Sequence, residues 1–356
     1  MSNLRPVTVI TGASAGIGAA LARVFARNGH ELALVARREE RLHALADEIA
    51  ATGAPQPVVL AADLFKPGVA GVISDALRAQ GAEPQFVVNN AGFGLVGLAA
   101  DLDRDEQLQM IDLNVRVLTE LSLAFVDSLA RQRGGLLNVG SMAGFLPGPR
   151  MAVYYATKAY VLSFTEALHS ELKPRGIRVS VLCPGPVPTE FADRAGLSKR
   201  AIGPSYLIQS ADDVAEAGYR GLMDGRRTVV PGAANKFITF LIRLTPRSLI
   251  LSFVDYRQKR RIRAAHIAVS TSLVLQTALK RLLVSKASIR RITHVEACSS
   301  HSASGTFVAG PCWPDIGETR LPTRHPAPAF RRSAAGDHGR ARRCGDIRRS
   351  AKRERQ

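Results

Sequence analysis

The sequence predicts an α/β fold in which a doubly wound parallel sheet of about seven strands carries helices on both faces. Two patterns in the first 230 residues support this prediction: short runs of continuous apolar, β-type residues recur, and longer amphipathic stretches separate them. Continuously apolar strands are typical of parallel sheets, and right-handed crossovers then place helices on each face. The expected strands are 7–11, 31–36, 58–62, 86–90, 135–141, 177–183 and 227–231.

The first expected strand runs into a glycine-rich turn, 11-TGASAGIG-18, which leads into an apolar helix at 19–29. Gly12, Gly16 and Gly18 have no Cβ atom to block a ligand, and the free N–H groups of the helix N-terminus attract a pyrophosphate. Glycine is also common in plain strand-to-helix turns, and the spacing G-x-x-x-G-x-G differs from the common G-x-G-x-x-G fingerprint. The position at the first strand–helix turn nevertheless favours a Rossmann-type dinucleotide site.

Two arginines follow the second expected strand in the stretch 33-ALVARREE-40, about 20 residues beyond the glycines. Arg37 and Arg38 stand where an acidic residue would bond the ribose of NAD(H), whereas a guanidinium can pair with the 2′-phosphate of NADP(H). Glu39 and Glu40 offer the arginines a simpler role as partners on a solvated helix start. Together with the glycine turn, the arginines favour NADP(H) over NAD(H).

Amphipathic stretches at 38–52 and 103–130 predict the helices between later strands, and polar residues follow several strand ends. Asn89 and Asn90 could bond their own backbone at a strand end, and a Pro–Gly pair often only ends a strand. At the carboxyl edge of a parallel sheet the same residues would face a ligand. The strand-end groups are 63-DL-64, 89-NNAG-92, 138-NVGS-141 and 184-PGPVPTEF-191.

The stretch 152-AVYYATKAY-160 places two tyrosines within one helical turn of a lysine. Residues three and four apart share a helix face, so Lys158 can reach either Tyr154 or Tyr155. A free tyrosine has a pKa near 10, and a neighbouring ammonium favours the phenolate and lowers that pKa. The pattern therefore indicates a tyrosine acid–base, and spacing alone leaves both tyrosines as candidates.

The run 236–256 is strongly apolar but is interrupted by Arg243 and by 246-PR-247, so it is too broken to span a membrane. We expect a pair of helices. Packing on the domain core and lying on a membrane surface are both compatible with the pattern, and we favour the first.

The net charge of +18 is concentrated in the last quarter of the chain. Residues 262–356 hold 18 Lys and Arg against 6 Asp and Glu, a balance of +12, whereas residues 1–261 hold 30 against 24, a balance of +6. The tail loses periodicity from about residue 262, with a weak amphipathic segment at 264–286, and contains too little apolar surface to fold, so we expect it to be largely disordered or weakly helical. Its scattered Arg, His and Cys also resemble a reading frame translated out of register.

The four cysteines show no metal-ligand spacing and no disulfide framework, which indicates a reducing, cytoplasmic setting. The first expected strand begins close to Met1, which leaves no room for a secretory leader, and none is expected.

The motifs taken together resemble the short-chain dehydrogenase/reductase family, in the family's order and spacing from about residue 5 to residue 191. The resemblance implies a catalytic domain over residues 1–261 that binds NADP(H), and it leaves the tail 262–356 outside. The Y-x-x-x-K spacing of the family selects Tyr154 rather than Tyr155, which stands where the family usually has a small residue.

The resemblance also implies roles for single residues. Asp63 would lie by the adenine, Thr189 by the nicotinamide carboxamide, Lys158 by the nicotinamide ribose, and Asn114 would bond a water that links Lys158 to solvent. The implied cofactor-binding residues are Gly12, Ser14, Gly16, Ile17, Gly18, Arg37, Arg38, Asp63, Leu64, Asn90, Ala91, Gly92, Tyr154, Lys158, Pro184, Gly185, Val187 and Thr189.

The implied activity is an NADP(H)-dependent oxidoreductase that interconverts a carbonyl and an alcohol by hydride transfer. Tyr154 would act as general acid or base, Lys158 would lower its pKa, and Ser141 would orient the substrate oxygen. Ser141 as a plain strand-end cap and Asn114 as a residue bonding its own helix are the simpler alternatives. The substrate would lie beneath residues 186–209, and the apolar run after Pro231 hints at a hydrophobic one.

An alternative function is a non-enzymatic nucleotide-binding scaffold whose basic tail binds nucleic acid or an acidic membrane surface. The tail lacks regular aromatic residues between its basic ones, which argues against nucleic acid. By resemblance we expect a homodimer or homotetramer formed through helices 103–130 and 152–174, and the apolar C-terminal run leaves a peripheral membrane contact open.

Overall fold

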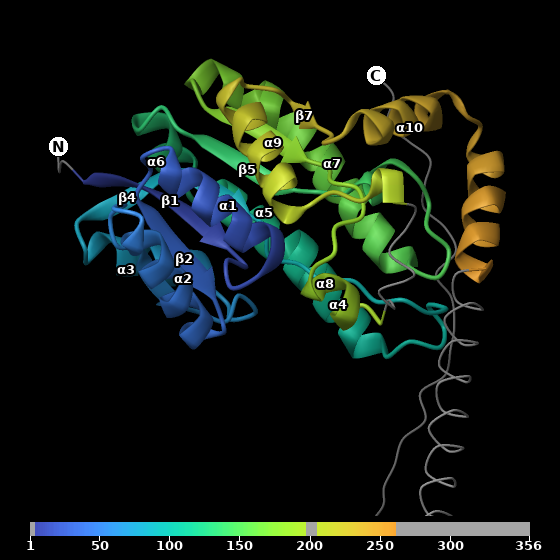
Figure 1. The fold of residues 1–356 in the computed structure, drawn as a ribbon, viewed down its shortest axis with the longest axis horizontal. Helices are drawn as coiled ribbons and strands as arrows, with labels where there is room; N and C mark the ends of the chain where they lie inside the picture. The colour runs from blue at the N-terminus through green and yellow to red at the C-terminus, as the bar shows by residue number, and fades with distance from the viewer. Residues whose placement is uncertain (1–3, 197–204, 261–356) are drawn as a thin grey trace, which may run out of the picture. The chain divides into compact units, whose positions relative to one another are not determined.

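The computed structural model describes residues 4–196 and 205–260. Within them the chain forms a seven-stranded parallel sheet in the order β3-β2-β1-β4-β5-β6-β7, with helices around it (Figure 1). The predicted doubly wound fold and all seven predicted strands are confirmed, whereas the predicted tail 262–356 lies outside the described residues. The strands are β1 (Arg5–Thr11), β2 (Leu32–Ala36), β3 (Val58–Ala61), β4 (Ala82–Asn89), β5 (Gly135–Val139), β6 (Arg178–Leu182) and β7 (Thr228–Val229).

The strand order reverses direction at the centre of the sheet, between β1 and β4. The chain builds outward from β1 to β3 and then returns to build from β4 to β7 on the other side. Loops at the carboxyl ends of β1 and β4 therefore diverge and leave a crevice between them, which is where doubly wound sheets bind ligands.

Two layers of helices bury the two faces of the sheet. One face packs against α1 (Gly16–Arg27), α2 (Glu39–Ala51) and α9 (Ala211–Met223). The other face packs against α3 (Val69–Arg78), α5 (Leu118–Ala124), α6 (Val126–Arg131) and α7 (Ala152–Leu172). The remaining elements are α4 (Arg104–Ile111), η1 (Asp112–Val117), η2 (Met142–Phe145), η3 (Lys173–Arg175), α8 (Glu190–Arg194), η5 (Ser205–Leu207) and α10 (Ala233–Leu244).

The continuous apolar character of the strands follows from burial on both faces. Val9 and Ile10 are consecutive residues of β1, and both are fully buried, but they belong to opposite layers of the core. Successive side chains of a strand point to opposite faces, so a strand covered on both sides must be apolar at every position.

The helical stretch predicted over 103–130 is divided into four pieces. Asp103 caps its start by accepting a hydrogen bond from the Glu106 N–H at 2.8 Å. The α-helical turns then give way to a π-helical segment, η1, before α5 and α6 complete the stretch. Such local widening is frequent at functional sites, and here it carries the buried side chain of Asn114.

A chain of buried polar side chains joins the central strands to the helices behind them. The Asn89 amide of β4 donates to Asn138 Oδ1 of β5 at 2.9 Å and to Ser122 Oγ of α5 at 3.0 Å. Asn138 in turn donates to Thr165 Oγ1 of α7 at 3.0 Å. Asn89 therefore bonds neighbouring elements, not only its own strand end, and the network ties two strands to two helices.

The apolar C-terminal run forms the expected pair of helices, α10 and a second helix over the described residues 247–260. The favoured placement of this run in the core is wrong for most of its large side chains, because Phe237, Phe240, Leu244 and Phe253 are exposed. The helices instead bury a narrow line of other residues.

Candidate active site at the carboxyl edge of the sheet

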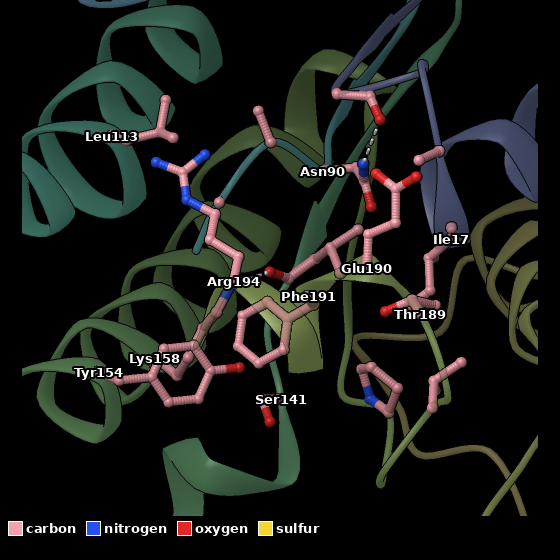
Figure 2. Close-up of a pocket in the computed structure, with 18 of the residues that line it drawn as sticks. Ile17, Asn90, Leu113, Ser141, Tyr154, Lys158, Thr189, Glu190, Phe191 and Arg194 are labelled. Atoms are coloured by element: carbon pink, nitrogen blue, oxygen red, sulfur yellow. Dashed lines mark hydrogen bonds between the residues drawn. The ribbon is translucent and has the colours of Figure 1, made fainter. Parts of the chain in front are cut away.

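A cavity of about 550 Å³ opens at the carboxyl ends of the strands beside the reversal point of the sheet. It brings together almost all of the residues that the sequence singled out, with the glycine turn at one end and Ser141, Tyr154 and Lys158 at the other (Figure 2). Gly18 and Asn114 do not line the cavity but support residues that do. The predicted site is thus one continuous cavity.

The glycine turn forms a cradle in which added side chains would collide. Gly12 and Gly16 adopt φ angles of +67° and +56°, which favour glycine. A Cβ atom on Gly18 would lie 2.3 Å from the Gly12 carbonyl oxygen. The Asn90 amide braces the turn by donating to the carbonyls of Thr11 and Gly12, at 3.0 and 3.2 Å.

The N-terminus of α1 faces this cradle without a side-chain cap, because its N-cap residue is Ala15. Its free N–H groups and the positive end of the helix dipole suit a pyrophosphate. Together with the space left by the glycines, this geometry fits the phosphates of a dinucleotide.

Arg37 and Arg38 both line the cavity at the end of β2. Arg38 donates to Ser14 Oγ at 3.0 and 3.2 Å and to the Glu190 carboxylate at 2.7 Å. Arg41 pairs with the same carboxylate. Arg37 to Glu40 are exposed around the start of α2, as the simpler role requires, but within the described residues Glu39 and Glu40 form no ion pair with Arg37 or Arg38.

Asp63 and Leu64 follow β3 and lie on the cavity wall, as do Ala91 and Gly92 after β4. The Asp63 carboxylate accepts a hydrogen bond from the Phe65 N–H at 3.2 Å, which shapes the turn. Pro184, Gly185, Val187 and Thr189 form the opposite wall after β6.

Ser141, Tyr154 and Lys158 come from two neighbouring elements, the end of β5 and the first turns of α7. The Tyr154 hydroxyl points toward the side of the cavity where Ser141 lies (Figure 2). Lys158 Nζ lies 5.9 Å from the centre of the Tyr154 ring and donates to the Val139 carbonyl at 2.8 Å. Ser141 also accepts from the Ala143 N–H at 3.1 Å, so the capping role and the position in the cavity coexist.

Burial dominates the ionisation of this group. It raises the pKa of Tyr154 above its ordinary value, and the interaction with the Ser141 side chain opposes that rise. Burial also lowers the pKa of Lys158 to about 8. Burial therefore outweighs the interaction with Ser141, and the expectation that Lys158 lowers the pKa of Tyr154 stays a prediction.

Asn114 makes three hydrogen bonds away from its own helical segment. Its amide donates to the Phe93 carbonyl at 2.9 Å and to Thr157 Oγ1 at 3.1 Å, and its Oδ1 accepts from the Phe93 N–H at 3.2 Å. The alternative in which Asn114 bonds only its own helix is wrong. Asn114 therefore joins the loop after β4, which carries Phe93, to α7, which carries Tyr154 and Lys158.

Tyr155 also lines the cavity, and its ring meets that of Tyr154 edge-on with centroids 6.1 Å apart. A Cβ atom on Gly148 would lie 2.2 Å from the Tyr155 ring, so this glycine makes room for it. Tyr155 is therefore a wall of the cavity beside the catalytic candidate.

Among the cavity residues to which the sequence assigned no role of their own are Glu190, Phe191 and Arg194 of α8. The Phe191 ring lies 5.3 Å from the Tyr154 ring (Figure 2). The Arg194 guanidinium stacks on the Phe93 ring at 4.2 Å. Burial lowers the pKa of Arg194. The sequence marked residues 186–209 as a cover for the substrate, but it contained no signal for which side chains turn inward.

A sequence model of the family described as short chain dehydrogenase matches residues 6–199. The chain belongs to this family. The match covers the glycine turn, the central strands, and the helix with Tyr154 and Lys158, and the family's members are oxidoreductases that act on alcohol or carbonyl groups. This family therefore accounts for the cavity described above.

Two relatives show the breadth of the family around this chain. Sulfoacetaldehyde reductase 2 of Chromohalobacter salexigens is 36% identical over 217 residues, which cover 59% of this chain and 85% of the relative. Very-long-chain 3-oxoacyl-CoA reductase of Anas platyrhynchos is 30% identical over 264 residues, which cover 72% and 80%.

A short-chain dehydrogenase from Sphingobium yanoikuyae, solved in complex with NADPH, is similar in structure. It has a TM-score of 0.59 and 33% identity, and the likeness covers 66% of this chain and 92% of the other. A Burkholderia phymatum enzyme solved with NAD has a TM-score of 0.59 and 25% identity, covering 68% and 94%. No helix within residues 4–196 and 205–260 is long and apolar enough to cross a membrane.

Proposed function

We propose that this chain is an NADP(H)-dependent oxidoreductase that interconverts a carbonyl and an alcohol, with Tyr154 as general acid or base. One observation carries the proposal: Ser141, Tyr154 and Lys158 line the same cavity as an intact glycine cradle and two arginines. A nucleotide-binding scaffold has no need of the first three residues.

The cavity fits a dinucleotide along its whole length. Phosphates would lie against the glycine turn and the N-terminus of α1, the adenosine between Asp63 and the arginines, and the nicotinamide near Thr189 and Lys158. When bound, the nicotinamide group supplies a hydride to the substrate carbon or accepts one from it.

The proton follows a separate route through the chain's own residues. Tyr154 donates its hydroxyl proton to a carbonyl oxygen during reduction and takes the proton back from an alcohol during oxidation. Ser141 hydrogen-bonds the same oxygen and fixes its position. Lys158, with a pKa of about 8, is mostly charged at neutral pH and stabilises the phenolate that the transfer leaves behind.

The preference for NADP(H) rests on charge at the end of β2. Arg37, Arg38 and Arg41 gather there, and position 37 holds a base where an acid would bond the ribose of NAD(H). The Glu190 carboxylate occupies two of these guanidinium groups, so a 2′-phosphate would share or displace it. Similar structures are solved with NADPH and with NAD, so the proposed preference rests on these arginines.

The substrate is proposed to be a small molecule with an apolar portion beside its carbonyl or alcohol group. Met142, Met151, Tyr155 and Phe191 form the apolar lining around Tyr154. These side chains exclude water from the reacting oxygen and favour an apolar substituent over a charged one.

We also propose a cytoplasmic homo-oligomer, a dimer or tetramer formed through the α4–α6 stretch and α7. Leu123 on α5 and Tyr160 on α7 are exposed, and Tyr160 stacks on Phe164 with ring centres 5.5 Å apart. An apolar, aromatic surface on these helices is suited to a second copy.

The test is a titration of NADPH and of NADH into the full chain, followed by cofactor fluorescence, for the wild type and for Arg37→Ala. We expect NADPH to bind more tightly than NADH, and Arg37→Ala to weaken NADPH alone. A screen of ketones and aldehydes with Tyr154→Phe as the inactive control then tests the reaction. Failure of a folded protein to bind either cofactor would overturn the proposal.

A further inference from the structure

The two C-terminal helices, α10 and the helix over residues 247–260, expose most of their large apolar side chains and bury several polar ones. Inside α10, the buried residues are Asn235 and Thr239, which are 1% and 6% exposed. The large apolar side chains point outward instead, with exposed fractions from 43% to 68%. They are Phe237, Phe240, Leu241, Leu244, Leu249, Leu251, Phe253 and Tyr256.

The contacts of the buried side of α10 fix the direction in which its exposed apolar side chains point. The Asn235 amide donates to the Pro231 carbonyl and to Gln209 Oε1, both at 3.1 Å. A Cβ atom on Gly185 would lie 2.6 Å from this amide, so α10 packs directly against the loop after β6. The outward direction of the aromatic side chains therefore follows from hydrogen bonds that hold the opposite side.

Basic residues accompany the apolar ones. Between residues 233 and 260 the chain has six basic side chains, all exposed, and one acidic side chain, Asp255, a balance of +5. Asp255 is paired with Lys259. The six are Lys236, Arg243, Arg247, Arg257, Lys259 and Arg260.

This charge decides which partner suits the face. An isologous contact with a second copy would bring two patches of balance +5 together, and like charges oppose that contact. The remaining chain, residues 262–356, has a balance of +12 and would be repelled in the same way. A partner must therefore combine negative charge at its surface with apolar material beneath it.

We propose that these two helices bind the surface of an anionic lipid bilayer. Phenylalanine and leucine side chains enter the boundary between headgroups and acyl chains, and the lysines and arginines pair with anionic headgroups. Figure 1 shows α10 and the following helix (gold and orange) beside the layers that cover the sheet rather than within them. Binding is peripheral, since neither described helix can span a bilayer.

The experiment measures co-sedimentation of the full chain with vesicles of phosphatidylcholine alone and of phosphatidylcholine mixed with phosphatidylglycerol. We expect binding to the anionic vesicles, weakening as salt is raised. The variant Phe237→Ser/Phe240→Ser/Leu244→Ser should lose at least about tenfold in binding. Its matched control is Val72→Ser/Leu98→Ser, which removes exposed apolar residues outside both the C-terminal helices and the proposed oligomer surface, and should bind like the wild type.

A second variant tests charge. Lys236→Glu/Arg247→Glu should weaken binding to anionic vesicles, while Arg78→Glu/Arg104→Glu, on other helices, should have a much smaller effect. Circular dichroism and NADPH binding confirm that each variant is folded.

The basic tail is present in every variant and serves as an internal comparison. Equal binding by the wild type and both C-terminal helix variants would assign any vesicle binding to the tail and overturn the proposal. Loss of self-association in the serine variant, without vesicle binding by the wild type, would assign the face to a second copy. Capture of an acidic protein by this face, again without vesicle binding, would also overturn it.

Discussion

Glu190 and Arg38 form an ion pair at 2.7 Å that joins α8 to the end of β2 across the mouth of the cofactor cavity. Arg41 shares the same carboxylate, and both arginines hold the pKa of Glu190 below its ordinary value. The residues proposed to select the cofactor are therefore engaged with the segment proposed to cover the substrate. A cofactor phosphate would compete with Glu190 for the same guanidinium groups.

Replacing Glu190 by glutamine should strengthen NADPH binding, because the phosphate no longer competes with a carboxylate. The Glu190–Arg38 ion pair is exposed and contributes little free energy. We therefore expect a gain of about two- to fivefold in NADPH affinity, with NADH affinity unchanged. Fluorescence titration of both cofactors measures this. Glu48→Gln, which removes a carboxylate paired with Arg23 outside the cavity, is the control. Weaker NADPH binding in Glu190→Gln would show that the carboxylate helps to hold the cofactor.

The two adjacent tyrosines should respond differently to loss of the hydroxyl. Tyr154→Phe should reduce kcat for carbonyl reduction by about 10²- to 10⁴-fold, because the proton donor is gone. Tyr155→Phe keeps the cavity wall and should retain most of the activity. Steady-state kinetics on both variants, with NADPH affinity measured alongside, distinguishes a chemical effect from a binding effect. Equal losses in the two variants would contradict the assignment of Tyr154.

Lys158 should make the free energy of unfolding depend on pH. Its pKa is about 8 in the folded chain and about 10.4 in an unfolded one. Between these values the unfolded chain binds more protons, so the contribution of Lys158 to the free energy of unfolding rises with pH, by about 3 kcal/mol in all. Denaturant unfolding at several pH values should show this rise in the wild type relative to Lys158→Met.

The exposed Lys173 of η3 supplies a matched variant, Lys173→Met, that removes a lysine outside the cavity. A constant difference between the wild type and Lys158→Met from pH 8 to 10.5 would show that Lys158 is not desolvated in the folded protein.

The glycine cradle should not tolerate a methyl group at position 18. A Cβ atom there would lie 2.3 Å from the Gly12 carbonyl and 2.4 Å from the Asn90 amide, so Gly18→Ala should cost about 1–3 kcal/mol and weaken both cofactors. Gly71→Ala, in α3 with nothing within 4 Å of the added atom, should stabilise by about 0.5–1 kcal/mol. Thermal unfolding and cofactor titration measure the two effects. An unchanged Gly18→Ala protein would mean that the turn can widen.

The sheet and most of the cavity follow from local patterns. Strand positions were readable because burial on both faces demands unbroken apolar runs. Helical spacing placed Tyr154 and Tyr155 within reach of Lys158, and only the family resemblance selected Tyr154. The Glu190–Arg38 pair was not readable, since its partners lie 152 residues apart and only the three-dimensional fold brings them together. The extent of burial around Tyr154 was not readable for a related reason, because the pattern shows the neighbouring cation but not the packing that removes water.

The sequence pattern also could not predict which side of α10 faces outward. An amphipathic sequence predicts that a helix has an apolar side, but not that Asn235 and Thr239 rather than Phe237 and Phe240 will meet the domain. Asn235 donates to the Pro231 carbonyl, in the loop before α10, and to Gln209 Oε1, in the loop before α9. The second bond depends on a packed neighbour rather than on the helix itself, so the pattern of the helix could not predict it.

The hydrogen bond between the side-chain amides of Asn89 and Asn138 bears on how the chain avoids misfolding. The two residues are paired partners in the parallel register of β4 and β5, and their amides meet inside the protein only in that register. Sliding β5 by a single residue would turn Asn138 to the opposite face, away from both Asn89 and Thr165, and leave its buried amide without these partners, at a cost of about 1–3 kcal/mol. An apolar pair would tolerate many alignments, whereas this pair penalises every alignment but one. The same penalty keeps the ends of β4 and β5 level, and so keeps Gly92 and Ser141 at one edge.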